Sequence, residues 1–197
     1  MSKNENSNLD YIIKVIVVLL LLIPFIFGYN IKYLFATSFT LFKLGIILFG
    51  IIFLAVVGYY LIPTLFTSYH LEKMKEHEVI MAFLKKDYDV LYKGFLFSMI
   101  LEELIFRFYI GTTLIQYIDV ILILIISGII FSFYHFHIWF GFKNVRILGA
   151  YLFFSFLLGI FNMYVLFELG LIFCIILHYL IVLMCYWRLF KIVRIRF

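Results

Sequence analysis

The stretch FKLGIILFGIIFLAVVGYYLIPTLF, residues 42–66, is apolar throughout except for the charged side chain of Lys43. A helix needs about 20 apolar residues to cross the hydrocarbon core of a bilayer, so this stretch can span a membrane. Further apolar runs cover residues 11–28, 94–115, 120–140, 148–167 and 171–190. Lipid offers no partners to backbone polar groups, so each run is expected to be a helix. The sequence therefore predicts an all-α, polytopic membrane helix bundle with about six transmembrane helices plus an interfacial segment.

The composition excludes a soluble globular protein. Of the 197 residues, 66% are hydrophobic and 14% are charged, whereas a soluble domain is about half apolar and roughly a quarter charged. A chain of this length has too little interior to bury so much apolar surface. The net charge of +5 comes from Lys and Arg residues that lie mostly between the apolar runs, where they set membrane orientation. We therefore expect the lipid bilayer, and no nucleic acid, as a partner.

The charges of the loops predict the orientation. The loop 67–93 contains five lysines, the loop after the fourth run contains Lys143 and Arg146, and the C-terminus is also basic. The loop 116–119 and the turn at Glu168 contain no basic residue, while Lys32 and Lys43 depart from the pattern. Short basic loops stay in the cytoplasm. We therefore expect a multi-pass protein of the cell membrane with both termini cytoplasmic.

Three parts are expected along the chain. Residues 1–93 would form two transmembrane helices and a cytoplasmic interfacial loop, residues 94–190 a four-helix core, and residues 191–197 a basic cytoplasmic tail. Charged and apolar residues alternate in the loop 67–93, which is typical of a partly helical segment at the membrane surface. Cys174 and Cys185 lie in one helical run, about 16 Å apart, too far for a disulfide. We expect them to be buried small hydrophobic residues.

Ionisable residues inside membrane helices are costly and therefore indicate function. Glu102, Glu103 and Arg107 lie in the third run. Glu103 and Arg107 are four residues apart, so they share a helix face and can pair, which lowers the cost of burying both charges. Glu102 is rotated by about 100° from Glu103, and a buried carboxylate without its own counter-ion suits a general base. The alternative is that both acids pair with Arg107 and only fix helix packing.

Histidines in two other runs lie at a similar depth. His135 and His137 lie near the end of the fourth run, and His178 lies inside the sixth. Residues two apart on a helix point in different directions, so we expect one of the first two to face Glu102 and His137 to be solvated at the headgroup level. His178 alone would be explained by an interhelical hydrogen bond. The predicted topology, however, places Glu102, His135 and His178 within roughly 10 Å of one another in depth.

A carboxylate with two histidines can activate a water molecule and stabilise an oxyanion. Two histidines and a glutamate also form a known zinc ligand set, so a zinc ion is compatible with these residues. The HExxH motif of soluble zinc proteases is absent. The residues alone leave a zinc site open.

Three motifs in order along the chain are EExxxR at 102–107, FxxxH at 131–135 and a later histidine, His178, in an apolar helix. Together they resemble the CAAX protease and bacteriocin-processing (CPBP, or Abi) family of intramembrane proteases, over about residues 95–187. The resemblance implies an endopeptidase that hydrolyses a peptide bond in a membrane-associated peptide or protein. In it, Glu102 and His135 would activate water and His178 would hold the oxyanion. Glu103 and Arg107 would form a structural ion pair, and no metal would be obligatory.

One position departs from the family pattern, HxxxN or HxxxD, in the third motif. Val182 occupies the last position, and its side chain cannot donate a hydrogen bond, whereas an oxyanion donor is worth about 10²- to 10³-fold in rate. Asn162 and Tyr179 are candidate replacements, and His137 and Asn162 are expected accessory residues.

Two other functions remain open. Val182 favours a catalytically weak or inactive protein on the same scaffold, acting in bacteriocin immunity or binding another membrane protein. A small transporter with the acids and histidines as a proton relay is the third hypothesis. The sequence shows no inverted repeat and no pair of helices broken by Gly or Pro, which transporters often contain.

Overall fold

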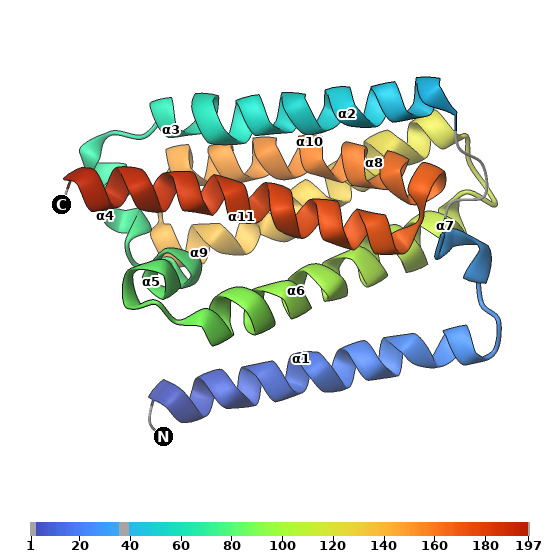
Figure 1. Cartoon of the computed structure of the whole chain (residues 1–197), viewed down its shortest axis with the longest axis horizontal. Coiled ribbons are helices and arrows are strands. Elements are labelled where there is room, and N and C mark those ends of the chain that lie inside the picture. The colour runs from blue at the N-terminus through green and yellow to red at the C-terminus, as the bar shows by residue number, and fades with distance from the viewer. Residues whose placement is uncertain (1–2, 36–39, 197) are drawn as a thin grey trace.

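The computed structural model describes residues 3–35 and 40–196, and these residues form helices and no strand. Long helical segments run side by side and alternate in direction (Figure 1). They are α1 (Lys3–Ile26), α2 to α3 (Leu41–Thr64), the segment 90–114 around α6 (Phe95–Glu102), α8 to α9 (Val120–Phe142), α10 (Val145–Leu169) and α11 (Leu171–Arg196). The predicted all-α bundle is confirmed, and each predicted run corresponds to one of these segments.

Four of these segments are long and apolar enough to cross a membrane: Leu41–Thr64, Val120–Phe142, Val145–Leu169 and Leu171–Ile195. The apolar part of α1, Tyr11–Ile26, is shorter. The segment 90–114 contains Glu102, Glu103 and Arg107 near its centre, so its composition does not meet the same test. Length and composition alone therefore support four spans, and the predicted number of about six depends on these two further helices.

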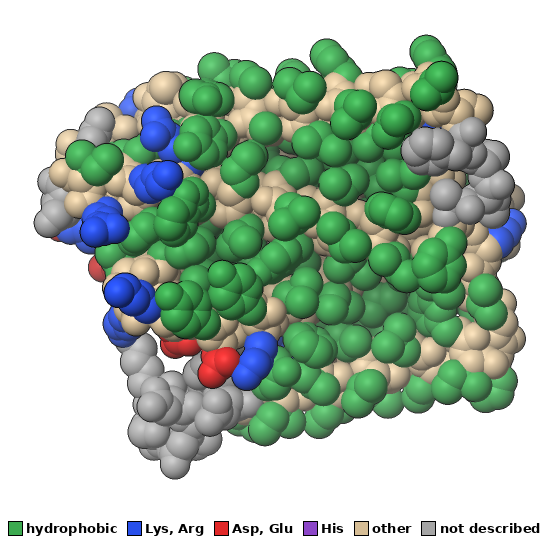
Figure 2. All heavy atoms as spheres, viewed as in Figure 1, with side chains coloured by type: hydrophobic (Ala, Val, Ile, Leu, Met, Phe, Trp, Pro, Cys, Tyr) green, Lys and Arg blue, Asp and Glu red, His purple; other side chains and the backbone are tan. Residues whose placement is uncertain are grey.

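Both termini lie at one end of the bundle, together with α4 (Ser68–Met74), α5 (Glu78–Lys85) and α9 (Ile138–Phe142) (Figure 1). Lys and Arg side chains gather at this end, while the middle of the visible face is almost entirely hydrophobic (Figure 2). We call this end the basic end. A band of apolar surface between polar ends is the distribution expected of a protein in a bilayer.

The helix ends follow from local capping. Asp119 precedes α8, and its side chain accepts a hydrogen bond from the Ile121 backbone N–H at 2.8 Å. Asn144 caps α10 in the same way through the Ile147 N–H at 3.1 Å. Such caps satisfy backbone donors that a helix start leaves free. They explain why α8 and α10 begin where the sequence changes from polar to apolar.

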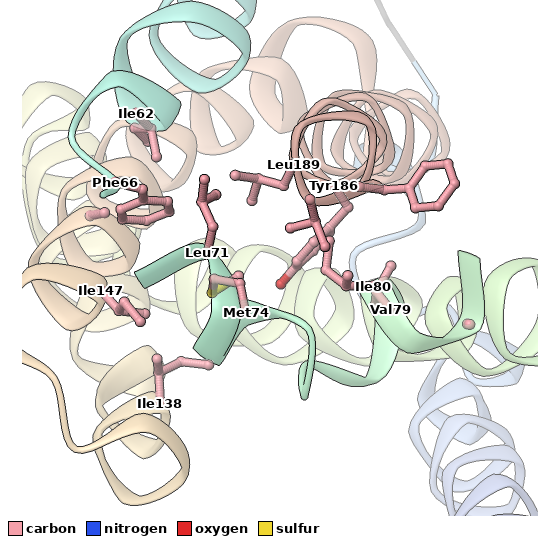
Figure 3. Packing of buried hydrophobic residues seen from close by; sticks show 14 of the residues in the cluster. Ile62, Phe66, Leu71, Met74, Val79, Ile80, Ile138, Ile147, Tyr186 and Leu189 are labelled. Carbon is pink, nitrogen blue, oxygen red and sulfur yellow. The ribbon is translucent and has the colours of Figure 1, made fainter. Parts of the chain in front are cut away.

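The segment 67–93, expected to lie at the membrane surface, is helical in part, as predicted, and packs into the bundle. α4 and α5 contact α11, and Leu71, Met74 and Ile80 are fully buried. Figure 3 shows these side chains facing Leu189 of α11. α11 itself continues to Arg196 through the residues expected as a basic tail.

α1 is joined to the segment 90–114 near the end opposite the basic end. The Tyr109 hydroxyl donates to the Leu21 carbonyl, and the rings of Phe25 and Phe108 stack with centroids 4.5 Å apart. After α1, the Asn30 amide donates to the Thr112 hydroxyl at 2.8 Å. These contacts fix the first helix against the one that contains both central glutamates.

α8 and α10 approach closely at a pair of glycines. A Cβ added to Gly159 would lie 2.7 Å from the Cα of Gly128, and one added to Gly128 would lie 2.9 Å from the Phe156 carbonyl oxygen. Small residues let membrane helices pack backbone to backbone. Gly149, on the same helix, has open space where its Cβ would be.

We therefore expect Gly159→Ala to destabilise the protein by about 1–3 kcal/mol, because the added methyl group must push two helix backbones apart. The matched control is Gly149→Ala, which should leave stability unchanged or slightly raise it, since alanine favours a helix. Thermal unfolding of both variants in detergent measures the difference. Equal melting temperatures for the two variants would show that the glycine contact does not hold the helices.

Candidate active site

Glu103 lies at the centre of the buried polar residues and is fully buried itself. Its carboxylate accepts hydrogen bonds from the Asn162 amide at 2.9 Å and from the Cys174 thiol at 2.8 Å. It also lies 2.5 Å from Nδ1 of His178 and 3.4 Å from Nε of Arg107. One carboxylate thus joins α10, α11 and its own helix, as expected for a buried charge that must be paired and hydrogen-bonded.

The helix becomes wider at Glu103. Residues Glu103–Gly111 form a π-helix, η4, which continues α6. Such turns are rare and often mark functional sites. Arg107 is fully buried in η4, and its guanidinium lies 3.7 Å from the ring centre of Phe131 on α8. A cation over an aromatic face is attracted to the ring, so Arg107 is held by Phe131 as well as by Glu103. The Glu103–Arg107 pair predicted from their spacing is present.

Glu102 points away from that pair and lines a cavity of about 350 Å³. The cavity is lined by Lys14 of α1 and by residues from α6, the α8–α9 junction, α10 and α11, and it extends towards α3 and α5. Glu102 Oε2 has no hydrogen-bond partner among the described residues, although it is buried. A buried oxygen of this kind in a cavity is free to hold a water molecule or a substrate group. Adjacent glutamates therefore have different environments, as their rotation on the helix predicted.

His178 lies between the two glutamates. Its Nδ1 contacts Glu103, and its Nε2 lies 3.8 Å from Glu102 Oε2. The second distance is too long for a direct hydrogen bond and is suited to a bridging water. Because the carboxylate of Glu103 accepts at Nδ1, the proton of a neutral His178 ring lies on that nitrogen and Nε2 faces the cavity. A carboxylate that orients a histidine in this way also stabilises its charged form.

His135 and His137 both line the cavity. They occupy a short 3₁₀ turn between α8 and α9, not a regular α-helix, which is why two residues in alternate positions face the same space. His135 Nδ1 lies 2.9 Å from the Phe131 carbonyl oxygen, and His137 Nδ1 lies 2.9 Å from the Tyr134 carbonyl oxygen. A carbonyl can only accept, so Nδ1 of His135 carries a proton and Nε2 remains available. His137 is exposed, as expected, and His135 is half-buried.

Val182 lines the cavity one helical turn beyond His178 and brings no polar atom to it. Asn162, considered as a replacement donor, is fully buried and gives its amide hydrogen to Glu103. The Tyr179 hydroxyl donates to the Leu91 carbonyl at 3.2 Å. The structure therefore directs both candidate replacements to protein partners rather than to the cavity.

Several residues of the site were not identified from the sequence. Cys174, expected to be a small hydrophobic residue, gives its thiol hydrogen to Glu103. Its position four residues before His178, on the same helix face, is the signal that would have found it. His77, Tyr151 and Tyr186 also line the cavity and hydrogen-bond to one another, and Tyr186 follows Val182 by one turn.

Within residues 3–35 and 40–196, no group of three or more His, Cys, Asp or Glu side chains is arranged to hold a metal ion. Nδ1 of His178 is occupied by Glu103, and Nδ1 of His135 by the Phe131 carbonyl. Because the described residues hold no such group, we derive no step through zinc.

The arrangement combines a carboxylate oxygen with no hydrogen-bond partner among the described residues, two imidazoles with Nε2 available and a largely apolar cavity at the basic end. Carboxylates and imidazoles near a water molecule can take up and return a proton.

The sequence was also compared with known protein families. The family model described as Type II CAAX prenyl endopeptidase Rce1-like matches residues 89–184, nearly half of the chain. No curated protein and no solved structure matches the chain. The match covers the residues that carry the sequence motifs and confirms the resemblance: residues 89–184 match the Rce1-like model of the CPBP family.

Proposed function

We propose that this chain is an intramembrane endopeptidase that hydrolyses a peptide bond in a membrane-associated peptide or protein. The observation that carries the proposal is the free Oε2 of Glu102, 3.8 Å from Nε2 of His178 inside one cavity. The family match supports a protease. The gathering of basic residues supports an orientation in the cell membrane with the basic end in the cytoplasm.

In this mechanism a water molecule between Glu102 and the histidines attacks the carbonyl carbon of the scissile bond. Glu102, assisted by His135, takes the water proton as a general base. His178, which takes up a proton on Nε2 from bulk water before the reaction and is held by Glu103, hydrogen-bonds through this N–H to the oxyanion and keeps its proton. Glu102 then returns the proton to the leaving nitrogen, the C–N bond breaks, and an acid and an amine are released.

Glu102→Gln should reduce cleavage by about 10²- to 10⁴-fold, because an amide cannot accept the water proton. The assay is cleavage of fluorescent membrane-associated peptides, prenylated and unmodified, by purified protein in detergent. Glu168→Gln is the matched control, since Glu168 pairs with Lys43 at 2.5 Å and lies outside the cavity. Full activity of the Glu102 variant at normal expression would overturn the proposal.

Glu103→Gln should act differently, through the fold. The substitution removes the charge that faces Arg107 and His178, and breaking a buried pair costs about 3–5 kcal/mol. We expect this variant to lower both thermal stability and cleavage, whereas Glu102→Gln should leave the melting temperature unchanged. Unfolding scans of the two variants measure the contrast. A stable and inactive Glu103 variant would move the role of general base from Glu102 to Glu103.

A second candidate function follows from Val182. A protein without an oxyanion donor at this position would bind a peptide or another membrane protein without cutting it, as in bacteriocin immunity. The apolar side chain of Val182 in the cavity wall supports this alternative.

Val182→Asn separates the two functions. If the chain is a protease, the new donor one turn from His178 should raise cleavage by at least 10-fold, towards the 10²- to 10³-fold of a full oxyanion donor. Val182→Leu, which keeps the position apolar, is the control. No gain over the wild-type protein, with a folded variant, would favour the non-catalytic function.

A further inference from the structure

Three side chains at the basic end of the cavity form a continuous hydrogen-bonded chain. His77 Nε2 lies 2.9 Å from Tyr186 Oη, and Tyr186 Oη lies 2.9 Å from Tyr151 Oη. His77 directly precedes α5, Tyr151 belongs to α10 and Tyr186 to α11. All three line the same cavity as Glu102 and His178. Figure 3 shows Tyr186 reaching from α11 towards the α4–α5 segment.

The backbone sets the direction of this chain. The Val79 N–H donates to His77 Nδ1 at 3.2 Å, as part of the cap of α5, so Nδ1 must be an acceptor. Burial, with a smaller contribution from His137, lowers the pKa of His77 to about 4. The imidazole is therefore neutral at physiological pH and carries its proton on Nε2. His77 must donate to the oxygen of Tyr186.

A count of the hydrogens shows that one is left over. The chain contains the Nε2–H of His77 and the two phenolic O–H groups, and two hydrogen bonds join them. Tyr186 accepts from His77, so whichever tyrosine donates to the other, one phenolic hydrogen has no acceptor within the chain. The described residues provide no further acceptor for either hydroxyl. One O–H donor is thus available to a group inside the cavity.

The position of this donor relates it to the catalytic residues. His178, Val182 and Tyr186 are spaced by four residues, so they share one face of α11. Tyr186 follows His178 by two turns, about 12 Å along the helix axis towards the basic end. An extended peptide advances about 3.3 Å per residue. A peptide with its scissile bond near His178 would therefore present an acceptor to the tyrosines about three to four residues along.

We propose that Tyr151 and Tyr186, oriented by His77, form a substrate-binding subsite that donates a hydrogen bond to a carbonyl or carboxylate oxygen of the peptide. This inference rests on the proposed function, because it requires that the cavity takes a peptide. A neutral donor in an apolar wall binds such an oxygen without the cost of burying a charge. His77 is a positioning residue here, and the tyrosines contact the ligand.

Tyr151→Phe tests the subsite, because it removes one hydroxyl and keeps the ring. The probe is a fluorescent S-farnesylated peptide, made with a free C-terminal carboxylate and as the C-terminal amide. Binding is measured in the Glu102→Gln background, so that no turnover interferes. Tyr179→Phe is the matched control, since it removes the hydroxyl of another half-buried tyrosine that lies outside the cavity lining. Thermal unfolding confirms that each variant is folded, and Tyr186→Phe serves as a second variant.

We expect Tyr151→Phe to weaken binding about 5- to 10-fold, the effect of one neutral hydrogen bond, with no change for Tyr179→Phe. A loss with both peptides identifies an internal carbonyl, and a loss with the free acid alone identifies the terminal carboxylate. Equal affinity of Tyr151→Phe and its parent, or no binding of either probe by the parent, overturns the subsite. In proteins that retain Glu102, Tyr151→Phe should raise KM and leave kcat nearly unchanged. Binding that depends on Tyr151 without any cleavage would instead overturn the proposed protease and keep the subsite.

Discussion

The rest of the site depends on the hydrogen bonds and the ion pair that the carboxylate of Glu103 makes. It receives the amide of Asn162, the thiol of Cys174 and Nδ1 of His178, and it faces Arg107. A charge buried without partners would cost far more than a small bundle can supply. These partners come from α10, α11 and η4, so the packing of the bundle and the orientation of His178 have the same cause. Glu102 does not share these hydrogen bonds, and its Oε2 lies in the cavity without a hydrogen-bond partner among the described residues.

Much of this arrangement could be predicted from the sequence because membrane helices obey strong local rules. The apolar runs predicted the helices, and the four-residue spacing predicted the Glu103–Arg107 pair. The common depth of Glu102, His135 and His178 indicated the shared cavity. Two features could not be predicted in this way. The 3₁₀ turn at His135 and the π-helix after Glu102 change which side chains share a face, and hydrophobic periodicity indicates neither of them.

A second reason explains why some residues of the site could not be identified from the sequence. Cys174, Tyr151 and Tyr186 are ordinary components of apolar helices, and their roles depend on partners far away in the chain, such as Glu103 for Cys174 and His77 for Tyr186. Only the packing of α5 and α10 against α11 brings these groups together. Spacing on one helix predicts which residues share a face, but it does not identify what the opposite helix brings to that face.

The bundle contains two separate hydrophobic clusters, one around the cavity at the basic end and one beyond Glu103 towards the opposite end. The second includes Leu104, Phe108 and Ile123, which have almost no exposure. Water and ionisable groups that reach part-way into a bilayer could carry protons over that part of its thickness. The second cluster fills the remaining thickness of the bundle with packed apolar side chains, which offer protons no hydrogen-bonded route. In the proposed protease, this layer would let a water molecule react part-way into the bilayer without opening a path for protons to the opposite end.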